Sequence, residues 1–403
     1  MTEISELHVA LQAVFSCPDK GEKLSNLAHQ LRMQDRPFEA LSWSRWAVRT
    51  QAWPDGVVDP RAWRVLAALL LDHGRFVEAD SVFRMASRPS ASVMSHLGRS
   101  RAMEGLGHWS QAWSLAEHRF LQTKLPVASL PPPHWIGWPD VDQLLVWDEQ
   151  GFGDTFQALR WLPFALEQVE TLELLVRPPL VRLLHKGLSW LGPGLRVKAR
   201  QKKHGIDVGG ACSGSLLSLP FLLRHRSLVD GTVLRLPPPR RSFQIDRMKM
   251  RIGLVWESGR YQNDPFHSLE YRRKSLPFNV RQQLVQALVQ RGVDVVSLQL
   301  GEDAVPQGAD FLEQAEALQG CDLLLSVDTA SAHLGGALGF PTWLLLPWAA
   351  ASRWQRRNET TPLYSSLLLF RQPRPGDWDG LLKNLLQRFD QVFASSKLPS
   401  LRL

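Results

Sequence analysis

Two glycines and an aspartate stand between a predicted strand and a predicted helix, at Gly151, Gly153 and Asp154. Glycines there let backbone amides approach a ligand closely, and the start of a helix carries partial positive charge that favours phosphate. The run does not match the dinucleotide fingerprint GxGxxG, because Phe156 stands where the third glycine is required. Asp154 has two interpretations: it caps the helix N-terminus, or it takes a proton from an acceptor hydroxyl.

A second group of polar residues, Asp328, Thr329 and His333, follows a strongly apolar run. The first two are expected at the turn between a buried strand and a helix, where amides can bind phosphate. His333 lies about one helical turn further on. The alternative is that Asp328 and Thr329 cap the helix and that His333 is a hydrogen-bonded core histidine. The spacing alone allows either interpretation.

Cations that could neutralise a diphosphate occur together at Arg272, Arg273 and Lys274. We place them in a cleft loop after a predicted strand that ends at Ser258. Room for phosphate oxygens is expected at Ser258 and Gly259. The alternative interpretation is a solvated surface run.

Short β-rich apolar runs alternate with amphipathic stretches from Asp142 onward, which is typical of parallel α/β folds. The expected strands of the first block are 143–147, 171–176, 195–199 and 206–210, with a helix beginning near Asp154. The second block is expected to contain strands 251–258, 293–300, 321–328 and 342–348, and helices 280–291, 309–320, 329–339 and 378–393. Such blocks predict two Rossmann-like lobes with a ligand cleft outside the carboxyl ends of their strands.

The first 125 residues repeat themselves, and the repeated positions carry small residues such as Ala40, Ala79 and Ala112. Alanine or glycine is needed where two helices cross, and larger residues fill the gaps between helix pairs. The pattern predicts tetratricopeptide-like helical repeats over 1–125, with an unrelated helical bundle as the alternative. A proline-rich linker is expected at 126–141, because its prolines break helices.

The chain of 403 residues has a formal net charge of +8, which favours a polyanionic partner. The surplus lies mainly between Arg177 and Arg251, where 16 Lys or Arg stand against 3 Asp. An anionic substrate and a membrane face bearing glycolipid are both consistent with this segment. No nucleic-acid-binding motif accompanies the charge, so a nucleic-acid partner is disfavoured.

The three cysteines, Cys17, Cys212 and Cys321, are far apart and odd in number. This disfavours a disulfide framework and a thiolate zinc site, and no metal is expected. The acidic N-terminus lacks a signal-peptide pattern, and no run approaches the roughly 20 apolar residues of a membrane span. We therefore expect a cytoplasmic protein, with peripheral contact to the inner face of the membrane left open.

The run LLVWDEQGFGDTFQALRWLP resembles the first motif of bacterial tetratricopeptide proteins that carry a glycosyltransferase family 9-like (heptosyltransferase-like) domain. The same resemblance covers PHWIG at 133–137, GLVWES at 253–258, RRKSLP at 272–277, SVDTASAHLGGALGFPTWLLLPW at 326–348 and RQPRPGDW at 371–378. It implies an α + α/β chain with a GT-B fold after the repeats. The expected parts are an acceptor-side lobe at 142–245, a nucleotide-sugar lobe at 246–375, and a C-terminal helix and tail at 376–403.

The resemblance also assigns roles to the residues that match the family motifs. Asp154 matches the catalytic base. The donor and its phosphates are expected at Gly151, Gly153, Ser258, Arg273, Lys274, Asp328, Thr329 and His333. Two positions depart from the family: Ala330 replaces a glycine that approaches the donor, and Asp148 stands where the repeat-containing relatives commonly have glycine.

The function implied is that of a glycosyltransferase of hexosyl or heptosyl type. It would move a sugar from a nucleotide-diphosphate sugar to a glycan or protein hydroxyl, with inversion and without metal or cofactor. The repeats would recruit a protein partner. Two alternatives remain: a catalytically silent tetratricopeptide scaffold with a degenerate transferase domain, and a nucleic-acid binder that uses the basic segment.

Overall fold

The computed structural model describes residues 20–50, 60–87, 92–121, 135–137, 141–200, 212–237, 249–259, 265–302, 304–356 and 358–393. The chain divides into two compact units. The helical unit comprises Met1–Thr123, Trp348–Arg357 and Arg374–Gly376, and the α/β unit comprises the remainder. The predicted strand at 206–210 and most of the predicted linker lie outside the described residues.

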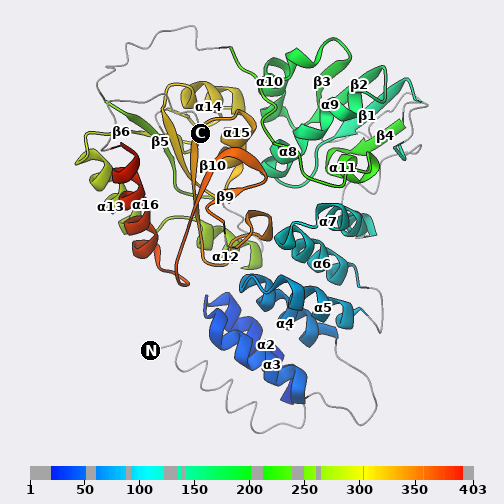
Figure 1. Cartoon of the computed structure of the whole chain (residues 1–403), viewed down its shortest axis with the longest axis vertical. Coiled ribbons are helices and arrows are strands. Elements are labelled where there is room, and N and C mark those ends of the chain that lie inside the picture. Colours follow the sequence, from blue (N-terminus) through cyan, green and yellow to red (C-terminus); the bar gives the residue numbers. More distant parts are fainter. Residues whose placement is uncertain are drawn as a thin grey trace. The chain divides into compact units, whose positions relative to one another are not determined.

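Within its described residues, the helical unit consists of successive helix pairs (Figure 1). The helices are α2 (Lys20–Met33), α3 (Pro37–Thr50), α4 (Pro60–Asp72), α5 (Phe76–Ala86), α6 (Val93–Leu106) and α7 (Trp109–Ala116), followed by the short 3-10 helix η1 (Glu117–Leu121). The repeated small residues are buried in their contacts, at Ala28, Ala40, Ala47, Ala67, Ala79, Ala86 and Ala112. Helices thus form where the repeats are predicted, and their tetratricopeptide class stays a prediction.

The turns inside the helix pairs share a left-handed residue. Asp35, Gly74 and Gly107 have φ angles of 60°, 68° and 76°, and they occupy equivalent positions of the sequence repeat. Glycine adopts this conformation without the steric cost that a Cβ atom brings. The turn geometry therefore explains why two of the three repeats carry glycine here.

A loop from the far C-terminal half of the chain belongs to the helical unit. Arg356 Nη1 donates hydrogen bonds to the backbone oxygens of Asp72, at 3.2 Å, and Trp348, at 2.5 Å. The Trp348 ring lies under the Arg356 guanidinium and contacts the rings of Phe38 and His73. Sequence analysis assigned this loop to the nucleotide-sugar lobe, whereas the structure packs it among the helices.

The first sheet of the α/β unit is parallel, with the order β3-β2-β1-β4 among the described strands. Its strands are β1 (Gln143–Trp147), β2 (Thr171–Val176), β3 (Leu195–Ala199) and β4 (Cys212–Ser215). Its helical segments are α8 (Phe152–Ala158), η3 (Leu159–Trp161), α9 (Leu162–Leu166), α10 (Pro178–Gly187), η4 (Ser189–Leu191), η5 (Leu216–Ser218) and α11 (Leu219–Leu222). The three predicted strands that fall within described residues are confirmed.

The second sheet has the order β6-β5-β7-β8-β10-β9, parallel except for β9. Its strands are β5 (Arg251–Val255), β6 (Asp294–Ser297), β7 (Leu323–Val327), β8 (Thr342–Leu346), β9 (Thr360–Thr361) and β10 (Tyr364–Arg371). Its helical segments are α12 (Pro265–Lys274), α13 (Phe278–Val289), α14 (Phe311–Leu318), α15 (Ala330–Ala337) and α16 (Trp378–Phe393). The short 3-10 helix η6 (Ser352–Trp354) lies in the loop that belongs to the helical unit. Leu284 of α13 and Leu385 of α16 share one buried cluster with the strands. The unit is thus a mixed α/β fold with parallel sheets.

Two elements of this lobe differ from expectation. The cation run is not in a loop, because Arg272, Arg273 and Lys274 form the last turn of α12. Cations are favoured at that end by the helix dipole. The long strand β10, which completes the sheet beside β8, has no counterpart among the predicted elements.

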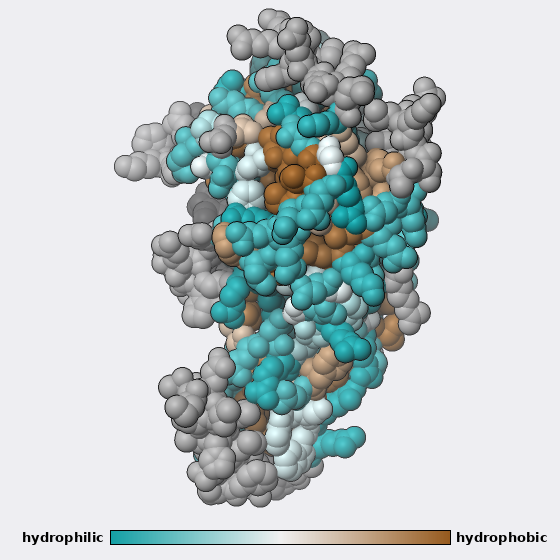
Figure 2. Space-filling view, turned by 90° about the vertical axis from the view of Figure 1, so that its left-hand side faces the viewer, coloured by the Kyte–Doolittle hydropathy of each residue, from teal (hydrophilic) through white to brown (hydrophobic). Residues whose placement is uncertain are grey.

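Figure 2 shows a largely hydrophilic surface, with apolar side chains gathered in the upper part of the view. In the second lobe, the large apolar side chains that are exposed among described residues are Phe278, Val289 and Leu300. No helix in the described ranges is long and apolar enough to cross a membrane.

The turn glycines allow a matched test of the helical unit. A Cβ atom on Gly107 would meet Gln355 Nε2 at an ordinary 3.4 Å, whereas one on Gly74 would lie 2.9 Å from Arg356 Cδ. Gly107→Ala should therefore lower the free energy of unfolding by about 1 kcal/mol through backbone strain. Gly74→Ala should lower it further because Arg356 must also move. Urea denaturation measures both, and equal losses would show that the Arg356 loop does not contribute.

Candidate functional site

Each sheet has a switch point, where the chain's successive strands change from adding on one side of the sheet to adding on the other. The predicted site residues come just after strands next to these switch points. The first sheet reverses between β1 and β4, and the second between β5 and β7. Asp154 follows β1, Ser258 follows β5, and Asp328 follows β7. Crevices at such switch points are where open α/β sheets bind ligands.

The loop after β1 is held by a buried ion pair. Asp148 is fully buried, and its Oδ2 accepts a hydrogen bond from Arg177 Nε at 2.6 Å. Arg177 also donates to the backbone oxygen of Gln150 and to Thr155 Oγ1, at 2.8 and 3.2 Å. Arg200 donates to the backbone oxygen of Asp148 at 2.8 Å. These contacts hold Gln150 in a left-handed conformation, with φ of 59°, and so fix the start of α8.

Asp154 lies in the first turn of α8, three residues after the N-cap residue Gly151. Its Oδ2 accepts a hydrogen bond from the Gly151 backbone nitrogen at 3.0 Å. Asp154 therefore caps the helix, but it does so from the first turn and not from the N-cap position. A carboxylate has further acceptor sites, so capping is compatible with chemistry at the same group.

The second-lobe residues converge on the end of β7. Lys274 Nζ of α12 lies 3.3 Å from Asp328 Oδ2, and Asp328 is 7% exposed. Ser258 donates its backbone N–H to Ser275 Oγ at 3.0 Å, which ties the end of β5 to the residue after Lys274. Asp328 is thus in an ion pair with Lys274, while Thr329 is the N-cap residue of α15 by position. In the cation run, Arg272 is exposed and Arg273 is partly buried.

Gly153 and His333 join the two groups. A Cβ atom on Gly153 would lie 2.7 Å from His333 Cδ2, so the imidazole packs directly against the glycine backbone. Phe152 and Phe156 of α8 extend the contact, because their rings meet the Phe311 ring at 4.9 and 5.1 Å. The first turn of α8, with Asp154, is therefore packed against α15, the helix that begins after Asp328.

Sequence analysis missed the residues that support this junction. His333 Nδ1 lies 3.0 Å from the Tyr364 hydroxyl on β10. Arg160, which is 2% exposed, lies over the Tyr364 ring. Arg160 could have been found from the sequence, because it belongs to the QALRWLP motif. Tyr364 could not, because its strand β10 was not predicted.

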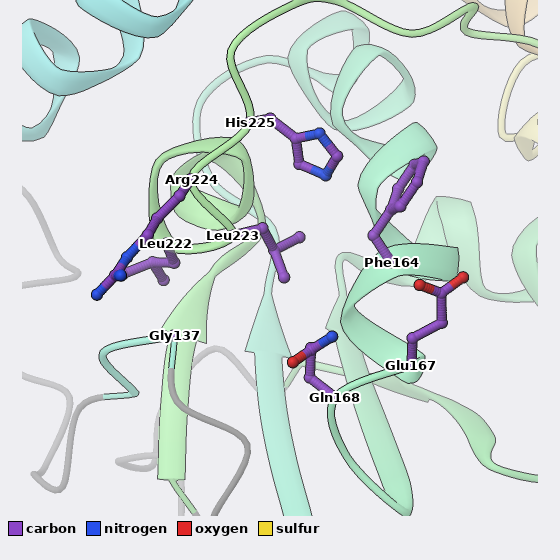
Figure 3. Close-up of a pocket in the computed structure, with 8 residues that line it drawn as sticks. All are labelled: Gly137, Phe164, Glu167, Gln168, Leu222, Leu223, Arg224 and His225. Carbon is purple, nitrogen blue, oxygen red and sulfur yellow. The ribbon is translucent and has the colours of Figure 1, made fainter.

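The pocket in Figure 3 lies away from these residues. It has a volume of about 330 Å³ and is lined by Gly137, Phe164, Glu167, Gln168, Leu222, Leu223, Arg224 and His225. A second pocket, of about 460 Å³, lies in the helical unit and is lined by Asp35, Arg36, Pro37, Phe38, Glu39, Arg374 and Pro375. Neither contains a predicted site residue, so the candidate site rests on the convergence of side chains. The described residues contain no cluster of three or more His, Cys, Asp or Glu that could hold a metal ion.

No protein-family profile matches the chain. It is 24% identical over 352 residues to protein FlbA of Caulobacter vibrioides, which covers 75% of this chain and 56% of FlbA. The chain thus spans little more than half the length of that relative.

Among solved structures, the chain is similar to Escherichia coli heptosyltransferase WaaC with ADP, at 13% identity over 62% of this chain and 99% of that one, with a TM-score of 0.42. It is also similar to a glycosyl transferase family 9 protein of Veillonella parvula, at 10% identity over 66% and 100%, with a TM-score of 0.41. A third is the iron-containing dodecameric glycosyltransferase TibC of enterotoxigenic Escherichia coli, at 14% identity over 52% and 58%, with a TM-score of 0.36.

Removal of the buried carboxylate should destabilise the loop before α8. Asp148→Ala should lower the free energy of unfolding by about 3 kcal/mol, because Arg177 and Arg200 lose their anionic partner. Asp390→Ala is the control, since it breaks the exposed pair with Arg291, joined at 2.7 Å, and exposed pairs contribute little. Comparable losses in urea denaturation would contradict the structural role of Asp148.

Proposed function

We propose that the protein is a glycosyltransferase that moves a sugar from a nucleotide-diphosphate sugar to a hydroxyl of a glycan or protein. The observation that carries the proposal is the Gly153–His333 junction. It brings the α8 turn with Asp154 against the helix that follows Asp328. Asp154 and the Lys274–Asp328 pair lie on two lobes of one unit, where the first would remove the proton and the second would mark the phosphate site.

The diphosphate would bind at the start of α15, where backbone amides and the helix dipole favour an anion. Lys274, now paired with Asp328, supplies an ammonium at the same place. Arg273 precedes it in the last turn of α12, and the Ser258 backbone is tied to that turn through Ser275. These positive groups would stabilise the leaving diphosphate without a metal.

Asp154 would act as the general base. As the acceptor oxygen attacks the anomeric carbon, the carboxylate takes its proton, and the bond from that carbon to the diphosphate oxygen breaks. Attack from the face opposite the leaving group inverts the anomeric configuration. Gly151 and Gly153 keep side chains away from this turn, and the bond from Gly151 N to Asp154 Oδ2 orients the carboxylate.

The acceptor is proposed as a glycan or a protein, because helical repeats commonly present a surface to another chain. The helical unit would then recruit a protein partner, and the basic segment would attract an anionic acceptor or the inner membrane face. Part of that segment, including 201–211 and 238–248, lies outside the described residues.

A catalytically silent scaffold is the second candidate, and Ala330 favours it. This residue is the first of α15, at the position where the family resemblance implies a glycine that approaches the donor. A methyl group there would narrow the space for a phosphate or sugar. A thermal-shift screen with UDP-, GDP-, ADP- and CMP-sugars separates the candidates. A higher melting temperature with one of these sugars supports the enzyme, and an unchanged melting temperature with all of them supports the scaffold. Salt-sensitive retention of RNA or DNA would instead support a nucleic-acid binder.

Asp154→Asn should reduce sugar transfer by a factor of about 10² to 10⁴, the usual contribution of a general base. Donor binding, measured by calorimetry, should stay within about twofold of the wild type, because the amide keeps the shape of the carboxylate and its oxygen can still accept from Gly151. Asp377→Asn is the control, since Asp377 also caps a helix through the Gly380 N–H, at 2.8 Å. Retained turnover in Asp154→Asn would remove this residue from the role of base.

Lys274→Gln should weaken binding of the nucleotide diphosphate by about tenfold or more, because a charged hydrogen bond to phosphate is lost. Lys383→Gln on α16 is the control for a general change in net charge. Titration calorimetry with the nucleotide diphosphate found in the screen measures both. Unchanged affinity in Lys274→Gln would place the phosphates elsewhere.

A further inference from the structure

The pocket of the first lobe shown in Figure 3 lies between the helices α9 and α11. Phe164 of α9 and the next polar residues, Glu167 and Gln168, form one side of it. Leu223 and His225, which follow α11, form another side. Its volume of about 330 Å³ is close to the lower limit of about 300 Å³ for ligand sites, so it suits a ligand of one or two rings.

The turn that ends α11 fixes the position of His225. Arg224 has the left-handed conformation, with φ of 55°, and the His225 N–H donates to the Pro220 backbone oxygen at 2.9 Å. The imidazole then lies beside two aromatic rings, with its centre 4.5 Å from that of Trp161 and 4.6 Å from that of Phe164. His225 is therefore part of a packed aromatic group at the pocket.

Three polar side chains at the pocket, those of Glu167, Gln168 and His225, make no hydrogen bond to the described part of the chain. Burial lowers the pKa of His225, although the Glu167 carboxylate acts in the opposite direction. The imidazole is therefore neutral at pH 7 and offers one N–H and one lone pair. Together with a carboxylate and a carboxamide, it presents both donors and acceptors to a ligand.

This set of groups suits a neutral ligand that is rich in hydroxyls. A hydroxyl both donates and accepts, so it can pair with the carboxamide, the imidazole or the carboxylate. The Phe164 ring and the Leu223 side chain offer apolar contact to the C–H face of a sugar ring. Glu167 disfavours a phosphate, and Arg224 disfavours an ammonium group, so the pocket favours neither charged class.

We propose that this pocket is a carbohydrate-binding site that holds a neutral sugar unit of a glycan acceptor, apart from the candidate transfer site. Its part in transfer rests on the proposed function, and there it selects a glycan over a protein as the acceptor. Glu167 and Gln168 bind hydroxyls of the sugar, and Phe164 packs against its ring. A glycan held at this second place has a higher effective concentration at the transfer site.

An oligosaccharide array that carries neutral, sialylated and phosphorylated glycans tests the site with the full chain and without nucleotide. We expect retention on neutral hexose oligosaccharides. Retention on none of the glycans, or on the anionic glycans alone, would overturn the proposal.

The location is tested by calorimetry with the neutral oligosaccharide that the array retains best. Gln168→Ala should weaken its binding about three- to tenfold, as for one lost hydrogen bond. Glu167→Gln should weaken it as well, because hydrogen bonds to a charged acceptor are the stronger ones. Neither side chain hydrogen-bonds the described part of the chain, so both variants should keep the wild-type melting temperature.

Gln286→Ala is the matched control, because Gln286 is an exposed glutamine on α13 of the second lobe. It should leave the affinity for the oligosaccharide unchanged. Equal affinities in Gln168→Ala, Glu167→Gln and Gln286→Ala would show that the sugar binds elsewhere.

Steady-state kinetics separate the site from the proposed function. If the oligosaccharide binds here but no nucleotide sugar stabilises the protein, the proposed function fails while the carbohydrate site stands. If the protein does transfer sugar, Gln168→Ala should raise the KM for the glycan acceptor and leave kcat unchanged. An unchanged KM, or transfer to protein acceptors alone, would overturn the role of the pocket in acceptor binding.

Discussion

The close approach of Gly153 to His333 is the contact on which the candidate site depends. Helices α8 and α15 come from different lobes, and they pack closely because the glycine leaves the imidazole room against its backbone. Interiors are packed to near-crystalline density, so a single methyl group at position 153 would have to displace the ring. The same contact makes the first turn of α8, which bears Asp154, a neighbour of the turn that bears Asp328.

Two ion pairs of different character support this arrangement. Arg177 uses its donors inside the first lobe, on Asp148, Gln150 and Thr155, so its charge serves the shape of the loop before α8. Lys274 pairs with Asp328 at the longer distance of 3.3 Å, in the turn where phosphate is proposed to bind. An anionic ligand would compete with Asp328 for Lys274, whereas nothing comparable would release Arg177. One pair is therefore structural, and the other is suited to ligand exchange.

The helical unit is not formed by the N-terminal repeats alone. Trp348 and Arg356, more than 200 residues later in the chain, pack against Phe38, His73 and the turn at Gly74. The chain thus leaves the α/β unit after β8 and returns to it before β9. The helical unit is consequently completed by residues that follow β8 in the chain.

The sequence by itself determined the elements whose signals are local. Buried strands appear in the sequence as short apolar runs, so β1, β2, β7 and β8 were predictable. The amphipathic pattern of α16 likewise predicted a helix at Trp378–Phe393. The polar residues at the strand ends could also be identified, because a turn shows its polar side chains directly in the local sequence. The cation run was misplaced in a loop because adjacent charges do not distinguish a loop from the last turn of a helix.

Only the tertiary structure decided which of these residues meet. The Lys274–Asp328 pair, the Gly153–His333 junction and the Arg160–Tyr364 contact each join segments separated by 54 to 204 residues. No local pattern encodes such pairings, because they follow from strand order and from the packing of helices across two sheets. Tyr364 shows this most clearly: its strand was not predicted, and the fold brings His333, Arg160 and two glycines to it from distant parts of the chain.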